Sequence, residues 1–99
     1  MFNLLFGSKI KNAIKNGAII IDLRTPREFD EGRIPGSINI PADRIPINAA
    51  RIKAMKRPVI LCGHSGSISV ARDYLLSHGV KEVHSGGSWI RVLNMVRSV

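Results

Sequence analysis

A short run of apolar residues constrains the fold of this chain more than any other feature. Residues 18–23 read Ala-Ile-Ile-Ile-Asp-Leu, and a continuous apolar run rich in β-branched side chains is typical of a strand buried on both faces of a sheet. Residues 58–61, Pro-Val-Ile-Leu, form a second apolar run that leads directly into Cys62. We interpret both runs as strands of a buried sheet.

Helical patterns alternate with these strands. Residues 8–16 carry apolar side chains at helical spacing and are followed by a glycine. A short helix is predicted to begin after Thr25, an N-cap residue type, with Pro26 at the first helical position. Glu28 lies three residues after Thr25, as a capping box requires, and Gly32 ends this helix.

The second half of the chain continues the alternation. The patterns predict further strands at residues 37–41 and 80–84 and place the strand of the second apolar run at residues 59–61. They predict helices within 42–56 (only after Pro46), at 68–77, and from Ser88 onward. Alternating strands and helices in 99 residues predict one α/β domain spanning residues 1–99. Its parallel sheet is expected to have four strands and helices on both faces.

Cys62 is the only cysteine, and it stands where a predicted strand meets a run of small residues before a helix. In such sheets ligands bind at the carboxyl ends of the strands. Unpaired N–H groups at a helix start favour a thiolate over a thiol, so this position suits a nucleophile. The alternative is that Cys62 is a small buried hydrophobic residue.

Charge and composition narrow the possible partners. The net charge is +8, and eleven of the fifteen Lys and Arg residues precede Pro58, which favours small anions or an acidic partner protein. Scattered basic residues without interleaved aromatic side chains argue against nucleic acid, and no run is long enough to span a bilayer. With no export signal and no possible internal disulfide, we expect a cytoplasmic protein.

Three segments of the chain match a known family pattern. Residues 21–29 read Ile-Asp-Leu-Arg-Thr-Pro-Arg-Glu-Phe, and residues 32–41 read Gly-Arg-Ile-Pro-Gly-Ser-Ile-Asn-Ile-Pro, close to that pattern's Gly-His-Ile-Pro-Gly-Ala segment. The third is the strand entering Cys62, with its helix, Gly79, and the Gly-Gly pair before Trp89. Together and in this order they resemble the rhodanese (sulfurtransferase) family, from about residue 8 to the end. It implies a rhodanese-like three-layer fold with five strands, so we expect four to five.

The resemblance also implies a reaction. In that family the cysteine takes sulfane sulfur from a donor such as thiosulfate, holds it as a persulfide, and passes it to a thiol or cyanide. Cys62 is then the catalytic residue, and no cofactor or metal is needed. The loop after it is expected to bind the anionic donor through backbone N–H groups and hydroxyls: Gly63, His64, Ser65, Gly66 and Ser67. A thiol acceptor protein is a possible partner.

The predicted loop departs from the family pattern. Family loops commonly read Cys-x-x-Gly-x-Arg-Ser, whereas this chain has Ser65 and Ser67 at the glycine and arginine positions and Ile68 at the last. We expect a six-residue loop from Cys62 to Ser67 that lacks a fixed positive charge. His64 supplies part of that charge when protonated. The change favours a protein or small-molecule persulfide over thiosulfate as donor.

Three other residues are candidates for supporting roles. Asp22 ends the first strand, where family members often carry an acid, although an acid there also serves to bind N–H groups of the next turn. Arg24 lies at the same sheet edge and either reaches the loop or pairs with Asp22. His84 follows the predicted fourth strand and is a candidate for facing the pocket.

Two other functions fit the sequence less well. A rhodanese-fold binding or regulatory module, in which Cys62 does not turn over, is consistent with the altered loop. A phosphatase or arsenate reductase on the same fold needs a longer loop and an arginine that clamps an oxyanion. The nearest arginine, Arg72, already falls in the predicted helix.

Overall fold

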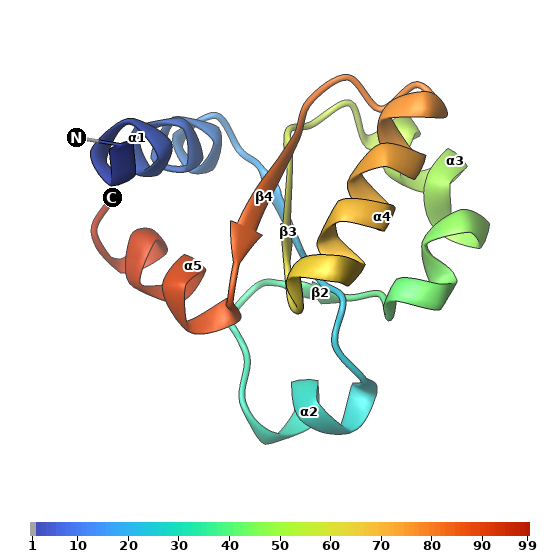
Figure 1. The fold of residues 1–99 in the computed structure, drawn as a ribbon, viewed down its shortest axis with the longest axis horizontal. Helices are drawn as coiled ribbons and strands as arrows, with labels where there is room; N and C mark the ends of the chain where they lie inside the picture. The colour runs from blue at the N-terminus through green and yellow to red at the C-terminus, as the bar shows by residue number, and fades with distance from the viewer. Residues whose placement is uncertain (1) are drawn as a thin grey trace.

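The computed structural model describes residues 2–99, and their side chains from residue 7 onward. Its helices and strands alternate along the chain as predicted (Figure 1). In chain order they are α1 (Phe2–Lys15), β1 (Ile19–Asp22), α2 (Pro26–Glu31), β2 (Ile38–Asn39), the 3-10 turn η1 (Ala42–Arg44), α3 (Ile45–Met55), β3 (Val59–Cys62), α4 (Ser65–Ser77), β4 (Val83–Gly87) and α5 (Trp89–Arg97).

The four described strands form one parallel sheet in the order β2-β1-β3-β4. The two apolar runs, β1 and β3, are its central strands, and their register pairs Asp22 with Cys62. This confirms the predicted α/β class. The last strand is shifted along the chain, since β4 spans Val83–Gly87 rather than residues 80–84. Residues 80–82 instead lead from α4 into β4.

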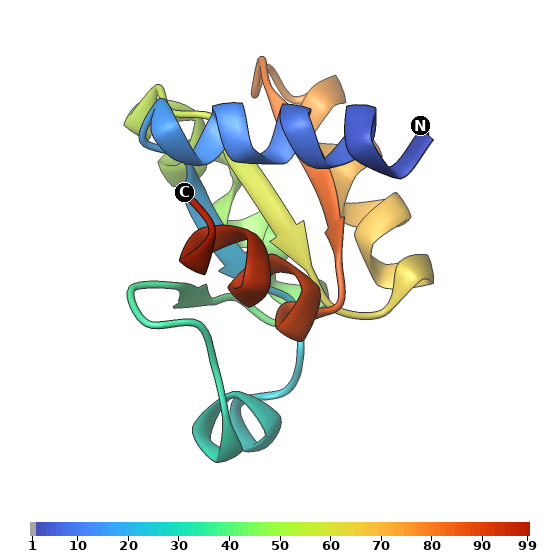
Figure 2. The same cartoon turned by 90° about the vertical axis from the view of Figure 1, so that its left-hand side faces the viewer.

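Helices cover both faces of the sheet. Helices α1 and α5 lie together on one face, and α3 and α4 lie on the other (Figures 1 and 2). The short helix α2 lies beyond the carboxyl ends of the strands (Figure 1). The result is the expected three-layer arrangement, with helix starts and loops gathered at the edge where a ligand is expected.

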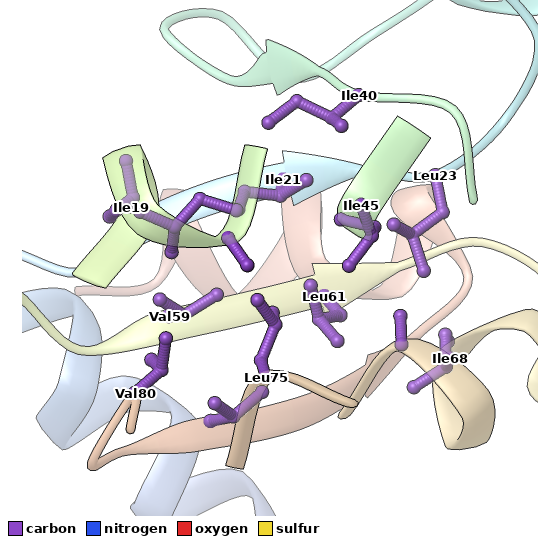
Figure 3. Packing of buried hydrophobic residues seen from close by; sticks show 14 residues of the cluster. Ile19, Ile21, Leu23, Ile40, Ile45, Val59, Leu61, Ile68, Leu75 and Val80 are labelled. Carbon is purple, nitrogen blue, oxygen red and sulfur yellow. The ribbon is translucent and has the colours of Figure 1, made fainter. Parts of the chain in front are cut away.

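Side chains alternate between the two faces along β1 and β3. Ile19, Ile21 and Leu23 of the first strand and its extension lie with Val59 and Leu61 in one buried cluster (Figure 3). Residues of α3 and α4 also belong to this cluster: Ile45, Ala49, Ile52, Ile68, Ala71 and Leu75. Its remaining buried members are Ile40, Val80 and Val83.

The second buried cluster lies on the α1 and α5 face. From β3 it takes Ile60 and Cys62, the residues between those of the first cluster. Its other buried members are Ile10, Ala13, Ile34 and Val92. Cys62 therefore points into the core under α1 and α5, on the face opposite α4.

The helix starts match the sequence in part. Thr25 and Glu28 form the predicted capping box, with the Glu28 N–H donating to Thr25 Oγ1 at 3.2 Å. Helix α3 begins at Ile45, before Pro46 rather than after it, because proline is tolerated in a first turn whose N–H groups have no intrahelical partner. Helix α4 begins at Ser65 rather than Ile68, which shortens the preceding loop.

Gly86 marks the closest packing at the edge of the sheet. The β3–β4 register skips it, so that Leu61 pairs with Ser85 and Cys62 with Gly87. A Cβ atom on Gly86 would lie 2.6 Å from Val92 Cγ2 and 3.0 Å from the Leu61 carbonyl oxygen. The backbone at this bulge can therefore approach β3 and α5 only without a side chain.

We predict that Gly86→Ala lowers the free energy of unfolding by about 1–3 kcal/mol, because an added methyl group overpacks a filled core. Urea denaturation followed by circular dichroism measures the change. Gly66→Ala is the matched control, since a Cβ there meets no atom within 4 Å and helices favour alanine over glycine. Equal stability of Gly86→Ala and the wild type would contradict the packing described here.

Candidate active site

Cys62 is held on both sides by the backbone of neighbouring strands. Its carbonyl oxygen accepts the Leu23 N–H at 2.9 Å, and the next residue, Gly63, donates its N–H to the Gly87 carbonyl at 3.0 Å. The Cys62 side chain has no exposed surface. The sulfur thus lies at the carboxyl end of β3, as predicted, but it is buried and not accessible to solvent.

The electrostatics of this site keep the sulfur protonated. Burial and, to a lesser extent, the nearby Asp22 carboxylate raise the pKa of the Cys62 thiol to about 12, while Arg24 opposes the rise. The prediction of a thiolate stabilised by a helix start is wrong for this conformation. The reason is the direction in which the Cys62 side chain points: it faces the α1 and α5 core, whereas α4 packs on the other face of the sheet.

The predicted six-residue loop is also wrong. Only Gly63 and His64 lie between β3 and α4, and the first turn of α4 closes when the Ile68 N–H donates to the His64 carbonyl at 2.9 Å. His64 is the exposed N-cap residue but makes no capping bond with its side chain. Ser65, Gly66 and Ser67 form the first helical turn instead of a nest around the sulfur, because nothing in these small residues prevents helical geometry.

Asp22 and Arg24 form a buried pair beside Cys62. The Asp22 side chain is fully buried, and it accepts bonds from Arg24 Nε at 3.0 Å and from Arg24 Nη2 at 2.8 Å. It also accepts the Arg24 backbone N–H at 3.0 Å, the turn-binding role expected of an acid here. Arg24 was expected either to reach the loop after Cys62 or to pair with Asp22, and in the structure it pairs with Asp22.

Arg24 makes further bonds that tie together the loops at this edge. Its Nη2 donates to the Gly32 carbonyl at 2.7 Å, and its guanidinium carbon lies 4.9 Å from the centre of the Trp89 ring. Hydrogen bonding and charge from Asp22 raise the pKa of Arg24. The side chain therefore links β1, the end of α2 and the start of α5.

Asn39 is a contributor that the sequence analysis did not single out. Its side-chain Nδ2 donates to the backbone carbonyls of Asp22 at 3.0 Å and Arg24 at 2.9 Å. The signal was present in the Asn-Ile-Pro segment, where a polar residue interrupts a short apolar strand. Asn39 fixes the backbone that carries the Asp22–Arg24 pair.

His84 does not lie at the sulfur. Because β4 begins at Val83, His84 is near the amino end of that strand, opposite Ile60. Its Nε2 is 2.7 Å from Glu82 Oε2. The structure therefore brings together Cys62, Asp22 and Arg24 but leaves His84 apart.

A pocket of about 410 Å³ lies beside the residue that follows Cys62. Gly63 and Ser65 line it at the start of α4, Gly87 and Ser88 at the start of α5, and Arg72 and Arg91 contribute two guanidinium groups. Asp73 also lines it, 4.0 Å from Arg72. Hydroxyl and guanidinium donors give this pocket the chemistry to hold a small anion.

The described part of the chain has neither a cluster of metal-binding side chains nor a membrane-spanning helix. No three His, Cys, Asp or Glu side chains come together there as they would around a metal ion. No described helix combines the length and apolar character needed to cross a membrane.

The chain is similar to known proteins over most of its length. A family model described as a rhodanese-like domain matches residues 7–88. The thiosulfate sulfurtransferase GlpE of Stutzerimonas stutzeri is 33% identical over 75 residues, covering 75% of this chain and 69% of that protein. GlpE of Pseudomonas aeruginosa PAO1 is 27% identical over 85% of this chain and 76% of that protein.

Solved structures agree on the fold. The single-domain sulfurtransferase RDL2 of Saccharomyces cerevisiae superposes with a TM-score of 0.63 at 18% identity, over 89% of this chain and 85% of that one. SSP1007 of Staphylococcus saprophyticus superposes with a TM-score of 0.63 at 28% identity, over 83% and 81%. Because the family model matches most of the chain and similar proteins are named sulfurtransferases, this chain belongs to the rhodanese-like domain family.

Proposed function

We propose that this protein is a sulfurtransferase that carries sulfane sulfur as a persulfide on Cys62. The observation that supports it is the position of Cys62 at the carboxyl end of the central strand β3, where α/β sheets bind ligands. Membership of a family with relatives named thiosulfate sulfurtransferases supports the same reaction class.

The proposed reaction has two displacement steps. The Cys62 thiolate attacks the outer sulfur of a donor such as thiosulfate, the donor's S–S bond breaks, and sulfite leaves with the bonding electrons. A thiolate or cyanide then attacks the outer sulfur of the Cys62 persulfide. The second S–S bond breaks and the Cys62 thiolate returns.

The buried sulfur must become accessible before either step. We infer that the described conformation is a resting state. When a donor binds, residues 63–67 change their backbone conformation and turn the Cys62 side chain out of the α1 and α5 core. Gly63 has a φ of 145° and Gly66 has no atom near its Cβ position, so backbone change here meets little steric resistance. Once opened to water, the thiol loses the burial that raises its pKa.

Arg72 and Arg91 are suited to hold the anionic donor. Their pocket adjoins Gly63, and Gly87 leaves room there for the Arg91 side chain, whose Nη1 lies 3.4 Å from the Cβ position of that glycine. They provide the positive charge that the loop sequence lacks. We propose that a small anionic sulfur donor docks in this pocket before it reaches Cys62.

A second candidate function is a binding or regulatory module in which Cys62 is not turned over. The observation that favours it is the complete burial of the sulfur together with its raised pKa. Such a module would use the same fold and surface without sulfur chemistry. The two candidates differ in whether Cys62 accepts a sulfur atom.

Intact mass spectrometry distinguishes these two functions. After incubation with thiosulfate or a low-molecular-weight persulfide, the sulfurtransferase is expected to gain one sulfur atom, which cyanide or a thiol then removes. Cys62→Ser is the control and should gain nothing. If neither donor adds sulfur to a folded wild-type protein, the binding module is the better description.

The resting state makes a prediction about alkylation. Because the closed form keeps the thiol protonated, the rate of reaction with iodoacetamide should rise continuously as the pH passes the free-thiol value of about 8.5. In urea the same profile should have its midpoint near that value. A native profile with its midpoint below pH 8.5 would mean that Cys62 is already an exposed thiolate, and the resting state would have to be abandoned.

A further inference from the structure

A second pocket, of about 470 Å³, lies at the amino ends of the strands, whereas Cys62 lies at a carboxyl end. Its lining residues come from the end of α3, the entry to β3 and the segment between α4 and β4. Figure 1 shows where these parts of the chain lie in the fold. Pro58 precedes β3 at this edge, whereas Cys62 ends the same strand. The pocket is therefore separate from the proposed sulfur-transfer site.

Positive charge is concentrated around this pocket. Lys53, Lys56, Arg57 and Lys81 line it, and Glu82 is its one acidic lining residue. Glu82 is bonded to His84 at 2.7 Å. Within residues 7–99, none of the four basic side chains has an acidic group within ion-pair distance. The pocket thus carries four cationic groups that lack anionic partners in the described part of the chain.

The backbone of Lys56 is unusual. Lys56 ends α3 in the left-handed conformation, with φ 54° and ψ 43°, and is the one non-glycine residue with positive φ among those described. Glycine is the residue that usually occupies this position after a helix, because a side chain there is strained. Lys56 thus places an ammonium group at this pocket despite a strained backbone, and strain of this kind is often found at functional sites.

Two other basic side chains are held in place by glycines. A Cβ on Gly79 would lie 2.9 Å from both Cε and Nζ of Lys53, so that side chain rests on the bare glycine backbone. Arg57 Nε donates to the Gly17 carbonyl at 2.6 Å. The Lys53 ammonium group therefore lies at a glycine that lines the pocket, whereas the Arg57 guanidinium is bonded to Gly17, which is not a lining residue.

The pocket also has an apolar floor. Ile52 and Val80 are 1% and 5% exposed, and Pro58 lies beside them. Small-molecule sites are typically about 300–1,000 Å³ and combine an apolar lining with a few polar groups. Ammonium groups act as point charges toward phosphate. The size, floor and charge together suit an anion that has an apolar part.

We propose that this pocket binds a small molecule with two or more adjacent phosphate groups and a flat apolar part, as in a nucleoside di- or triphosphate. The phosphates contact Lys53, Lys56 and Lys81, and the apolar part lies over Ile52 and Val80. This site does not depend on the sulfurtransferase activity.

Isothermal titration of the full chain tests the proposal with ATP, pyrophosphate and adenosine as probes. ATP and pyrophosphate should bind saturably at low salt, ATP more tightly, and adenosine should not bind. Lys53→Gln/Lys81→Gln should raise the ATP dissociation constant about tenfold or more, because each removed charge weakens attraction to phosphate. Arg51→Gln/Lys9→Gln removes the same charge from exposed positions outside the pocket and should bind ATP as the wild type does.

Lys56→Gly separates ligand binding from structural support. It should raise the urea midpoint, because glycine relieves the left-handed strain, and yet weaken ATP binding. A lysine with only a structural role would not combine these effects. The proposal is overturned if ATP does not saturate the wild type, if adenosine alone binds as well as ATP, or if both double variants lose affinity equally. Any of these results leaves the sulfur mass gain at Cys62 unaffected.

Discussion

Side chains alternate between the two faces of the sheet along β3, and this alternation decides what surrounds Cys62. Val59 and Leu61 face α3 and α4, so Ile60 and Cys62 must face α1 and α5. A shift of one residue would turn Cys62 toward the start of α4 and expose a different set of side chains to the core. The apolar register of β3 therefore fixes both the fold and the protonation of the sulfur.

The Asp22–Arg24 pair connects this register to the carboxyl edge of the sheet. Asp22 occupies the position beside Cys62 and is buried for the same reason. Its charge is compensated because Arg24 meets both of its carboxylate oxygens, and removing one partner of such a buried pair costs about 3–5 kcal/mol. Arg24 then reaches Gly32 and Trp89, so the charge beside the sulfur also positions the loops around it.

Local signals in the sequence predicted the fold well because each can be recognised within a few consecutive residues. The capping box is closed between Thr25 and Glu28, and the β1 and β3 runs are uninterrupted apolar segments. The site was harder to predict because its properties depend on contacts across the sheet. The buried direction of Cys62, the short connection to α4 and the start of β4 at Val83 all depend on strand pairing that no local pattern records.

The two edges of the sheet differ in how they hold charge, and this difference bears on the chemistry of each. At the carboxyl edge, Arg24 is bonded to Asp22 and to backbone carbonyls, so it stabilises structure and has few donors left for a ligand. At the amino edge, strand starts contribute no acidic side chain except Glu82, which is bonded to His84. Cations there keep their attraction for anions in solution. In this chain of net charge +8, the Arg24 cation next to the thiol is neutralised by Asp22. The cations at the amino ends of the same strands remain available to bind anions.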